Sequence, residues 1–204
     1  MKIAIIGGTG KMGRGLATLL RTNYEVYIGS RDPGKAEAAA EVAGVKGGES
    51  HSVAELCDAA ILTIPPEAIA SLESFKKQLA DKLVVTPIVP MREEGGIFYY
   101  REGQDSAAQQ VASSLKSSRV SAALHTVPSR FLKHPEKLNV DVLIAADERS
   151  TFEETAEIVK RLGSVRPLYA GPLSTASSLE MITPLLLNLA KLNGIKAPSV
   201  RFVD

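Results

Sequence analysis

Short apolar runs alternate along the chain with segments in which apolar residues recur at every third or fourth position. Several of these runs end directly in glycine or proline, as the buried strands of parallel sheets often do, and the spaced segments have the period of a helix. We expect strands at residues 3–6, 25–28, 59–64, 83–86, 120–124, 142–146 and 166–169, and helices at residues 10–20, 33–43, 52–57, 67–79, 105–115, 151–162 and 178–192.

This alternation predicts an α/β fold of the Rossmann type, a doubly wound and mostly parallel sheet with helices on both faces. We assign residues 1–170 to this domain and residues 171–204 to a small C-terminal helical element. The expected C-terminal helix contains Pro184, which we expect to bend it, and has leucine on several sides, which suits a lid or a dimer interface. Residues 91–104 have no clear period, and we interpret them as a functional loop.

The composition narrows the classes of partner. The 204 residues are 45% apolar and 23% charged, as in folded globular proteins. A formal net charge of +1 gives no general attraction for nucleic acid. The longest apolar runs are too short to span a membrane, Cys57 is the single cysteine, and the histidines are too scattered for a metal site. We therefore expect a cytoplasmic protein that binds small molecules, without metal, nucleic-acid or membrane partners.

A glycine-rich turn follows the first expected strand and precedes the first expected helix. It consists of Gly8, Thr9, Gly10, Lys11, Met12 and Gly13, which fit the pattern G-x-G-x-x-G. In this context the first glycine permits a tight turn, the second lets a pyrophosphate approach the backbone, and the third lets helix and strand pack closely. The turn therefore predicts a dinucleotide site, and a glycine-rich turn without a ligand is the alternative.

The end of the second expected strand indicates which dinucleotide binds. An NAD site would have an acidic residue at this strand end, but this chain has Ser30 and Arg31, with Lys35 one helical turn further on. A hydroxyl, a guanidinium and an ammonium group suit a 2′-phosphate, so we expect NADP. Asp32 comes one residue late and is expected to cap the helix that begins at Pro33. The alternative is that the two basic residues form a solvated face.

Three further strand ends contain proline and suit the faces of flat rings. They are residues 63–66 with Thr63, Ile64 and Pro65, residues 86–90 with Val89, and residues 124–128 with His125, Thr126 and Val127. His125 is the only histidine at such a position, and we take it as the candidate catalytic residue that orients a ring. The alternative is a packed histidine with a structural role.

The chain shows no pair of residues suited to acid–base catalysis. No tyrosine is followed four positions later by lysine, which excludes the pair used by short-chain dehydrogenases. Enzymes that act on alcohols or ketones must move a proton as well as a hydride. A reaction between two hydride-carrying rings needs mainly face-to-face positioning, which this sequence suits better.

The chain resembles the archaeal and actinobacterial family of F420-dependent NADP oxidoreductases, or NADPH-dependent F420 reductases. The resemblance covers nearly the whole sequence, and several of the matching strings are rare. It rests on residues 7–10 with Gly13, and on residues 29–31, 62–65, 89–90, 121–126, 166–168, 170–174 and 185–193.

The resemblance implies hydride transfer between NADP(H) and the deazaflavin coenzyme F420, by a homodimer formed through the C-terminal helical region. It implies that Thr9, Ser30, Arg31 and Lys35 bind the adenine–ribose phosphate end of NADP, and that Ile64, Pro65, Val89 and residues 125–127 shape the ring pocket. Residues 46–50 and 91–103 depart from the family pattern. The alternatives are therefore an NADPH-dependent flavin or ferric reductase, and a non-catalytic NADP-sensing regulator.

Overall fold

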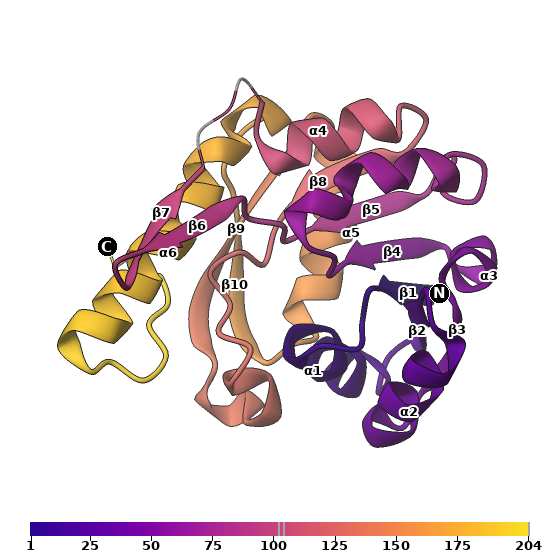
Figure 1. The fold of residues 1–204 in the computed structure, drawn as a ribbon, viewed down its shortest axis with the longest axis horizontal. Helices are drawn as coiled ribbons and strands as arrows, with labels where there is room; N and C mark the ends of the chain where they lie inside the picture. Colours follow the sequence, from indigo (N-terminus) through magenta and orange to yellow (C-terminus); the bar gives the residue numbers. More distant parts are fainter. Residues whose placement is uncertain (102, 104, 204) are drawn as a thin grey trace.

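The computed structural model describes residues 1–101, 103 and 105–203, and its centre is a twisted eight-stranded sheet (Figure 1). The strand order is β10-β9-β8-β5-β4-β1-β2-β3, and every neighbouring pair is parallel except β8 and β9. The strands are β1 (Lys2–Ile6), β2 (Glu25–Ser30), β3 (Lys46–Glu49), β4 (Ala59–Leu62), β5 (Leu83–Thr86), β8 (Arg119–Ala122), β9 (Asn139–Ala146) and β10 (Ser164–Tyr169).

Helices cover both faces of this sheet, so the predicted doubly wound fold is confirmed. The helices are α1 (Lys11–Leu20), α2 (Pro33–Ala43), α3 (Ser50–Leu56), η1 (Pro66–Phe75), α4 (Ala107–Ser114), η2 (Phe131–Lys133), η3 (Pro135–Lys137), α5 (Arg149–Lys160), η4 (Leu173–Thr175) and α6 (Ala176–Asn193), where η marks a 3-10 helix. Successive residues of β1 point to opposite faces, so Ile3 and Ile5 pack with α1, α2 and α5, while Ala4 and Ile6 pack with the layer of α3, η1, α4 and α6.

Residues 91–104 are not the irregular loop that the sequence suggested. A two-stranded antiparallel hairpin forms here, with β6 (Met91–Glu94) and β7 (Ile97–Tyr100) joined at Gly95 and Gly96, which both have positive φ. The hairpin lies against α6, where Asn188 exchanges two hydrogen bonds of 2.8 Å with the backbone of Phe98. Residues 102 and 104 of the expected loop lie outside the described residues.

Two further expectations about local structure were wrong. β3 was not expected, because its sequence Lys-Gly-Gly-Glu has no apolar residue; it forms by pairing with β2. A Cβ atom at Gly47 would lie 2.6 Å from the carbonyl oxygen of Ala36, so glycine is needed where α2 crosses. The next helix, α3, begins earlier than expected and is capped by the carboxylate of Glu49 rather than by a serine.

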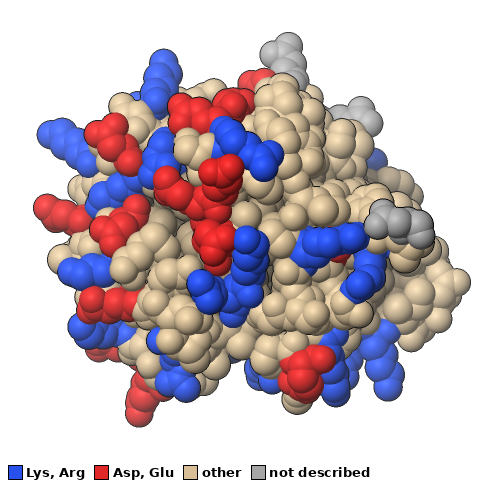
Figure 2. Space-filling view, turned by 180° about the vertical axis from the view of Figure 1, so that it is seen from behind, with Lys and Arg blue, Asp and Glu red and all other residues tan. Residues whose placement is uncertain are grey.

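The charged side chains are unevenly spread over the surface. Acidic side chains gather toward the left of Figure 2, and few are seen toward the right, which is the side of α6 and the C-terminus when Figure 1 is turned around. Four large apolar side chains of α6 are exposed on this C-terminal element, namely Met181, Leu185, Leu189 and Leu192. Acidic side chains are therefore sparse on the side of the molecule that carries α6 in this view.

Candidate dinucleotide and ring site

The glycine turn of residues 8–13 has the close packing that a phosphate-binding turn requires. A Cβ atom at Gly13 would lie 2.4 Å from the Cα atom of Gly8, so both positions need glycine for helix α1 to begin this close to β1. A Cβ atom at Gly10 would meet nothing within 4 Å, which leaves the mouth of the turn open. The first turn of α1 has no acidic residue, so its free N–H groups and dipole favour an anion.

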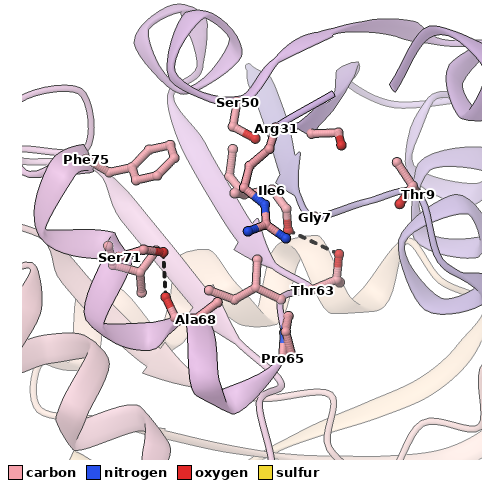
Figure 3. Close-up of a pocket in the computed structure, with 13 residues that line it drawn as sticks. Ile6, Gly7, Thr9, Arg31, Ser50, Thr63, Pro65, Ala68, Ser71 and Phe75 are labelled. Atoms are coloured by element: carbon pink, nitrogen blue, oxygen red, sulfur yellow. Dashed lines mark hydrogen bonds between the residues drawn. The ribbon is translucent and has the colours of Figure 1, made fainter. Parts of the chain in front are cut away.

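A cavity of about 210 Å3 lies beside this turn, and we call it the Arg31 cavity (Figure 3). It is lined by Ile6, Gly7, Thr9, Ser30, Arg31, Ser50, Thr63, Ile64, Pro65, Ala68, Ser71, Leu72 and Phe75. Figure 3 shows the Arg31 side chain reaching from the end of β2 into this space. The guanidinium, together with the hydroxyls of Ser30 and Ser50, gives one wall the donors that a phosphate needs.

The structure separates Lys35 from this cavity. Asp32 caps α2, as predicted, by accepting a hydrogen bond of 3.2 Å from the backbone nitrogen of Lys35. The Lys35 ammonium lies 3.6 Å from the carboxylate of Asp32 on the exposed side of the helix. Of the three residues expected to hold a 2′-phosphate, Ser30 and Arg31 line the cavity and Lys35 does not.

The opposite wall of the Arg31 cavity is apolar and comes from η1. Its Phe75 ring is stacked on the ring of His51, with centroids 4.0 Å apart and planes 8° from parallel. The His51 ring contacts Glu49 at 3.1 Å through Nδ1 and Ser74 at 3.0 Å through Nε2. Phe75 is therefore held against His51, and it contributes an aromatic side chain to the lining of the Arg31 cavity.

A second cavity of about 270 Å3, which we call the His125 cavity, adjoins the first at Thr63 and Ile64. It is lined by Met12, Leu62, Thr63, Ile64, Pro66, Pro87, Ile88, Val89, Met91, Leu124, His125, Val127 and Thr183. Thr63 is fixed by donating a hydrogen bond of 3.2 Å from its hydroxyl to the carbonyl of Ile6. The lining is mostly apolar and suits a flat ring with few polar groups.

His125 is 8% exposed, and its Nε2 atom has no hydrogen-bond partner among the described residues. Burial lowers the pKa of His125 to about 3, so the imidazole is neutral near pH 7. The preceding residue, Leu124, has φ of 71°, a left-handed conformation that is strained for leucine. Thr183 of α6 holds the turn by donating a hydrogen bond of 3.0 Å to the carbonyl of His125. The ring therefore offers an unused polar atom beside an apolar cavity.

The other residues that were predicted to bind the coenzymes lie in the two cavities, in the glycine turn or outside both. Pro65 lines the Arg31 cavity rather than the ring side, and Thr126 lines neither of the two cavities. The turn is built by Gly8, Gly10, Lys11 and Gly13, which line neither of the two cavities. Lining residues that the sequence reasoning did not assign to the site include Ser50 and Phe75 in the Arg31 cavity, and Met91 and Thr183 in the His125 cavity. Ser50 follows the unpredicted strand β3, and Thr183 reaches the site only through tertiary packing.

The fold and the glycine turn define a Rossmann-type dinucleotide-binding protein. Residues 2–90 match the family model for coenzyme F420-dependent NADP oxidoreductases. The F420-dependent NADP reductase of Methanothermobacter thermautotrophicus is 36% identical over 221 positions, covering 100% of this chain and 95% of the relative. That of Methanocaldococcus jannaschii is 32% identical and covers 93% of this chain and 92% of the relative. The chain belongs to the F420-dependent NADP reductase family.

Solved structures agree on the fold. A crystal structure from Arthrobacter sp. FB24, provisionally described as an F420-dependent NADP reductase, has a TM-score of 0.89, 24% identity and full coverage of both chains. An imine reductase from Bacillus cereus has a TM-score of 0.68 and 19% identity, covering 96% of this chain and 64% of that one. Among the described residues, no helix is both long and apolar enough to cross a membrane, and no cluster of potential metal ligands occurs.

Proposed function

We propose that this protein transfers a hydride directly between NADP(H) and the deazaflavin coenzyme F420. The observation that carries this proposal is the meeting of the two cavities at Thr63 and Ile64, which joins a phosphate-binding corner to an apolar ring site. Membership of the F420-dependent NADP reductase family supports the choice of both coenzymes. The reaction class is thus that of an NADPH:coenzyme F420 oxidoreductase.

NADPH would supply two electrons and one proton as a hydride, and the reduced deazaflavin would take its second proton from solution. The residues of the His125 cavity would exclude water and hold the two rings face to face. His125, which is neutral near pH 7, would orient a ring through its free Nε2 atom instead of moving a proton. This division of roles fits a site whose lining includes no carboxylate, lysine or tyrosine among the described residues.

The residues of the glycine turn, the Arg31 cavity and the His125 cavity suit the successive parts of NADP. The glycine turn, which includes Lys11 and Met12, would bind the pyrophosphate. The 2′-phosphate end would be bound by Thr9, Ser30 and Arg31, and Lys35 would add positive charge from outside the cavity. The open mouth at Gly10 leaves room for the pyrophosphate. Thr63, Ile64, Val89 and Val127 would form the walls around the nicotinamide and its acceptor, whereas Pro65 lines the Arg31 cavity and Thr126 lines neither of the two cavities.

The C-terminal element, residues 171–204, would serve assembly while residues 1–170 bind NADP. Met181, Leu185 and Leu189 are exposed and four residues apart, so they form one apolar stripe along α6. Pairing of two such stripes would bury them in a homodimer. A free, buried Cys57 agrees with a reducing compartment, and we place the protein in the cytoplasm.

An absorbance assay tests the function directly. NADPH mixed with F420 and the purified protein is expected to bleach the visible band of the deazaflavin, and NADH is expected to be a much poorer donor. Parallel reactions with FMN, FAD and ferric citrate serve as acceptor controls. Reduction of a flavin or of iron without bleaching of F420 would contradict the acceptor assignment, and binding of NADPH without oxidation by any acceptor would indicate a sensor.

A further inference from the structure

Ser50 brings an unused hydroxyl group to the Arg31 cavity. The residue is 3% exposed and lies in the cavity wall at the start of α3. In the part of the chain that the structure describes, no group forms a hydrogen bond with this hydroxyl. A buried hydroxyl without a partner is unfavourable, and nearly all such groups in folded proteins are hydrogen-bonded. The missing acceptor is therefore expected to come from a ligand in the cavity.

The pairing of β2 with β3 explains why Ser50 reaches this cavity. In the register of the two strands, Ser30 lies opposite Glu49. The residues that follow them, Arg31 and Ser50, therefore leave the same edge of the sheet side by side. Gly29 makes this approach possible, because a Cβ atom there would lie 3.2 Å from the Cα atom of Ser50. Figure 3 shows Ser50 beside the Arg31 side chain, so the two belong to one wall.

The backbone on both sides of Ser50 is fixed by its neighbours. The Glu49 carboxylate accepts hydrogen bonds of 2.8 Å from the backbone nitrogen of His51 and of 3.1 Å from that of Ser52. The His51 ring contacts the same carboxylate at 3.1 Å and is stacked on Phe75 of η1. Glu49 does not line the cavity, and its charge is directed to these donors. The Ser50 hydroxyl is therefore presented to the cavity from an anchored turn.

The charge and the other hydroxyls of the cavity indicate which ligand group Ser50 meets. Among the described residues that line the cavity, Arg31 has the only charged side chain. Ser71 and Thr63 already donate hydrogen bonds to backbone carbonyls, at 2.6 Å and 3.2 Å (Figure 3). The Ser50 hydroxyl has no such partner and lies beside the guanidinium. One cation and a free hydroxyl on the same wall suit a phosphate, which has several acceptor oxygens.

We propose that Ser50 is a further specificity-determining residue, which donates a hydrogen bond to the 2′-phosphate of NADP(H) beside Arg31. This proposal rests on the proposed function, because it takes NADP as the occupant of the Arg31 cavity. The guanidinium attracts a phosphate through its charge, and salt weakens that attraction. The Ser50 hydroxyl is neutral and acts only over the length of a hydrogen bond. Ser50 therefore contributes selectivity for the 2′-phosphate that persists at high salt.

Binding of nucleotides that lack the nicotinamide tests the assignment without turnover. The probes are adenosine 2′,5′-bisphosphate and 5′-AMP, which differ only in the 2′-phosphate. Ser50→Ala is expected to raise the Kd of the bisphosphate about tenfold, because a hydrogen bond to a charged group is lost. The Kd of 5′-AMP is expected to stay nearly unchanged. Calorimetric titration of both probes at low and at high salt measures the ratio of the two Kd values.

The matched control is Ser52→Ala, which removes an exposed hydroxyl from the same helix outside the cavity and is expected to keep both Kd values. Ser50→Cys keeps a side chain of similar size with a weak donor, so it is expected to behave like Ser50→Ala, and it replaces that variant if the latter does not fold. Thermal unfolding of each variant shows whether the fold is kept.

Three results would overturn the proposal. The first is a Kd ratio in Ser50→Ala equal to that of the wild type. The second is an equal loss of affinity for both nucleotides, which would show that the substitution distorts the cavity as a whole. The third is an effect of Ser50→Ala that disappears at high salt, because loss of a neutral donor should act at any salt concentration.

These outcomes separate the inference from the proposed function. If NADPH bleaches F420 but Ser50→Ala leaves the Kd ratio unchanged, the assignment of Ser50 fails and the proposed function stands. If the ratio depends on Ser50 but F420 is not reduced, the assignment of Ser50 stands and the proposed function fails.

Discussion

The carboxylate of Glu180 accepts a hydrogen bond of 2.7 Å from the hydroxyl of Tyr100. It also accepts hydrogen bonds of 3.1 Å from the backbone nitrogens of Ala107 and Ala108, at the start of α4. Glu180 is fully buried in α6, so one side chain ties together the hairpin, α4 and the C-terminal helix. Thr183, one turn further along α6, holds the His125 turn, and this network therefore fixes one wall of the ring site.

Glu180→Ala is expected to lower the free energy of unfolding by about 2–4 kcal/mol, because it leaves two buried backbone donors and the partly buried Tyr100 hydroxyl without their acceptor. Tyr100→Phe removes one donor and leaves the carboxylate with its two backbone partners, so about 1 kcal/mol is expected. Urea unfolding of both variants measures the difference. Equal losses in the two variants would show that the backbone contacts to α4 contribute nothing.

His125 makes stability depend on pH with a definite sign. Its pKa is near 6.5 when unfolded and about 3 when folded, so the unfolded chain binds the extra proton first. The stability due to neutral His125 is therefore present above pH 6.5 and is lost as pH falls toward 3. The wild type is expected to lose up to about 1.4 kcal/mol per pH unit more than His125→Asn in this window. Urea unfolding between pH 7 and 4.5 measures both slopes, and parallel slopes would contradict the assignment.

The sequence predicted those parts of the fold that depend on local pattern. The apolar run of β1, the glycine turn and the Asp32 cap each follow from neighbouring residues, so they could be predicted without tertiary contacts. β3 could not, because Lys46–Glu49 has no apolar residue and becomes a strand only by pairing with β2. The hairpin differs, because Gly95 and Gly96 followed by the apolar and aromatic residues of β7 are a local signal that the sequence interpretation passed over. Its position against α6 could not be predicted, since Asn188, which holds β7, lies ninety residues away.

The site was predictable to a similar degree. Strand ends gather at one edge of a parallel sheet, which is why Arg31, Thr63 and His125 could be placed near one another. The sequence reasoning could not tell that Lys35 turns back to Asp32, since that contact depends on a rotamer. Nor could it find Thr183, because the place where α6 crosses the site depends on packing through Glu180.

Substitutions at Gly10 and Gly13 should separate effects on NADPH binding from effects on the stability of the fold. Gly10→Ala adds a methyl group where nothing lies within 4 Å, so the fold is expected to keep its stability while the methyl group blocks the pyrophosphate. Gly13→Ala places a Cβ atom 2.4 Å from the Gly8 backbone, so it is expected to destabilise the protein by several kcal/mol. Thermal unfolding and NADPH titration of both variants measure the two effects. Wild-type affinity in Gly10→Ala would contradict the phosphate assignment.

Arg31→Ala is expected to raise the KM for NADPH about tenfold or more and to leave the KM for NADH nearly unchanged, because only NADPH has the 2′-phosphate. Lys35→Ala is the matched control, since Lys35 lies outside the Arg31 cavity and pairs with Asp32. Its effect on NADPH is expected to be at most a few-fold, through loss of surface charge. Steady-state kinetics with both nucleotides measure the ratio, and equal increases for NADPH and NADH would refute the assignment of Arg31.

The apolar stripe on α6 predicts the oligomeric state. If Met181, Leu185 and Leu189 form a homodimer interface, the wild type should have about twice the 21.7 kDa mass of one chain in solution. Leu185, which is 57% exposed, is expected to tolerate aspartate in a folded monomer, and Leu185→Asp should therefore dissociate the dimer without lowering monomer stability. Leu56→Asp is the control, because Leu56 on α3 is 51% exposed and lies outside the stripe. Sedimentation equilibrium measures the mass of each form. A monomeric wild type would contradict the dimer. A Leu185→Asp variant that remains dimeric would show that the interface lies elsewhere, because the prediction rests only on burial of this stripe.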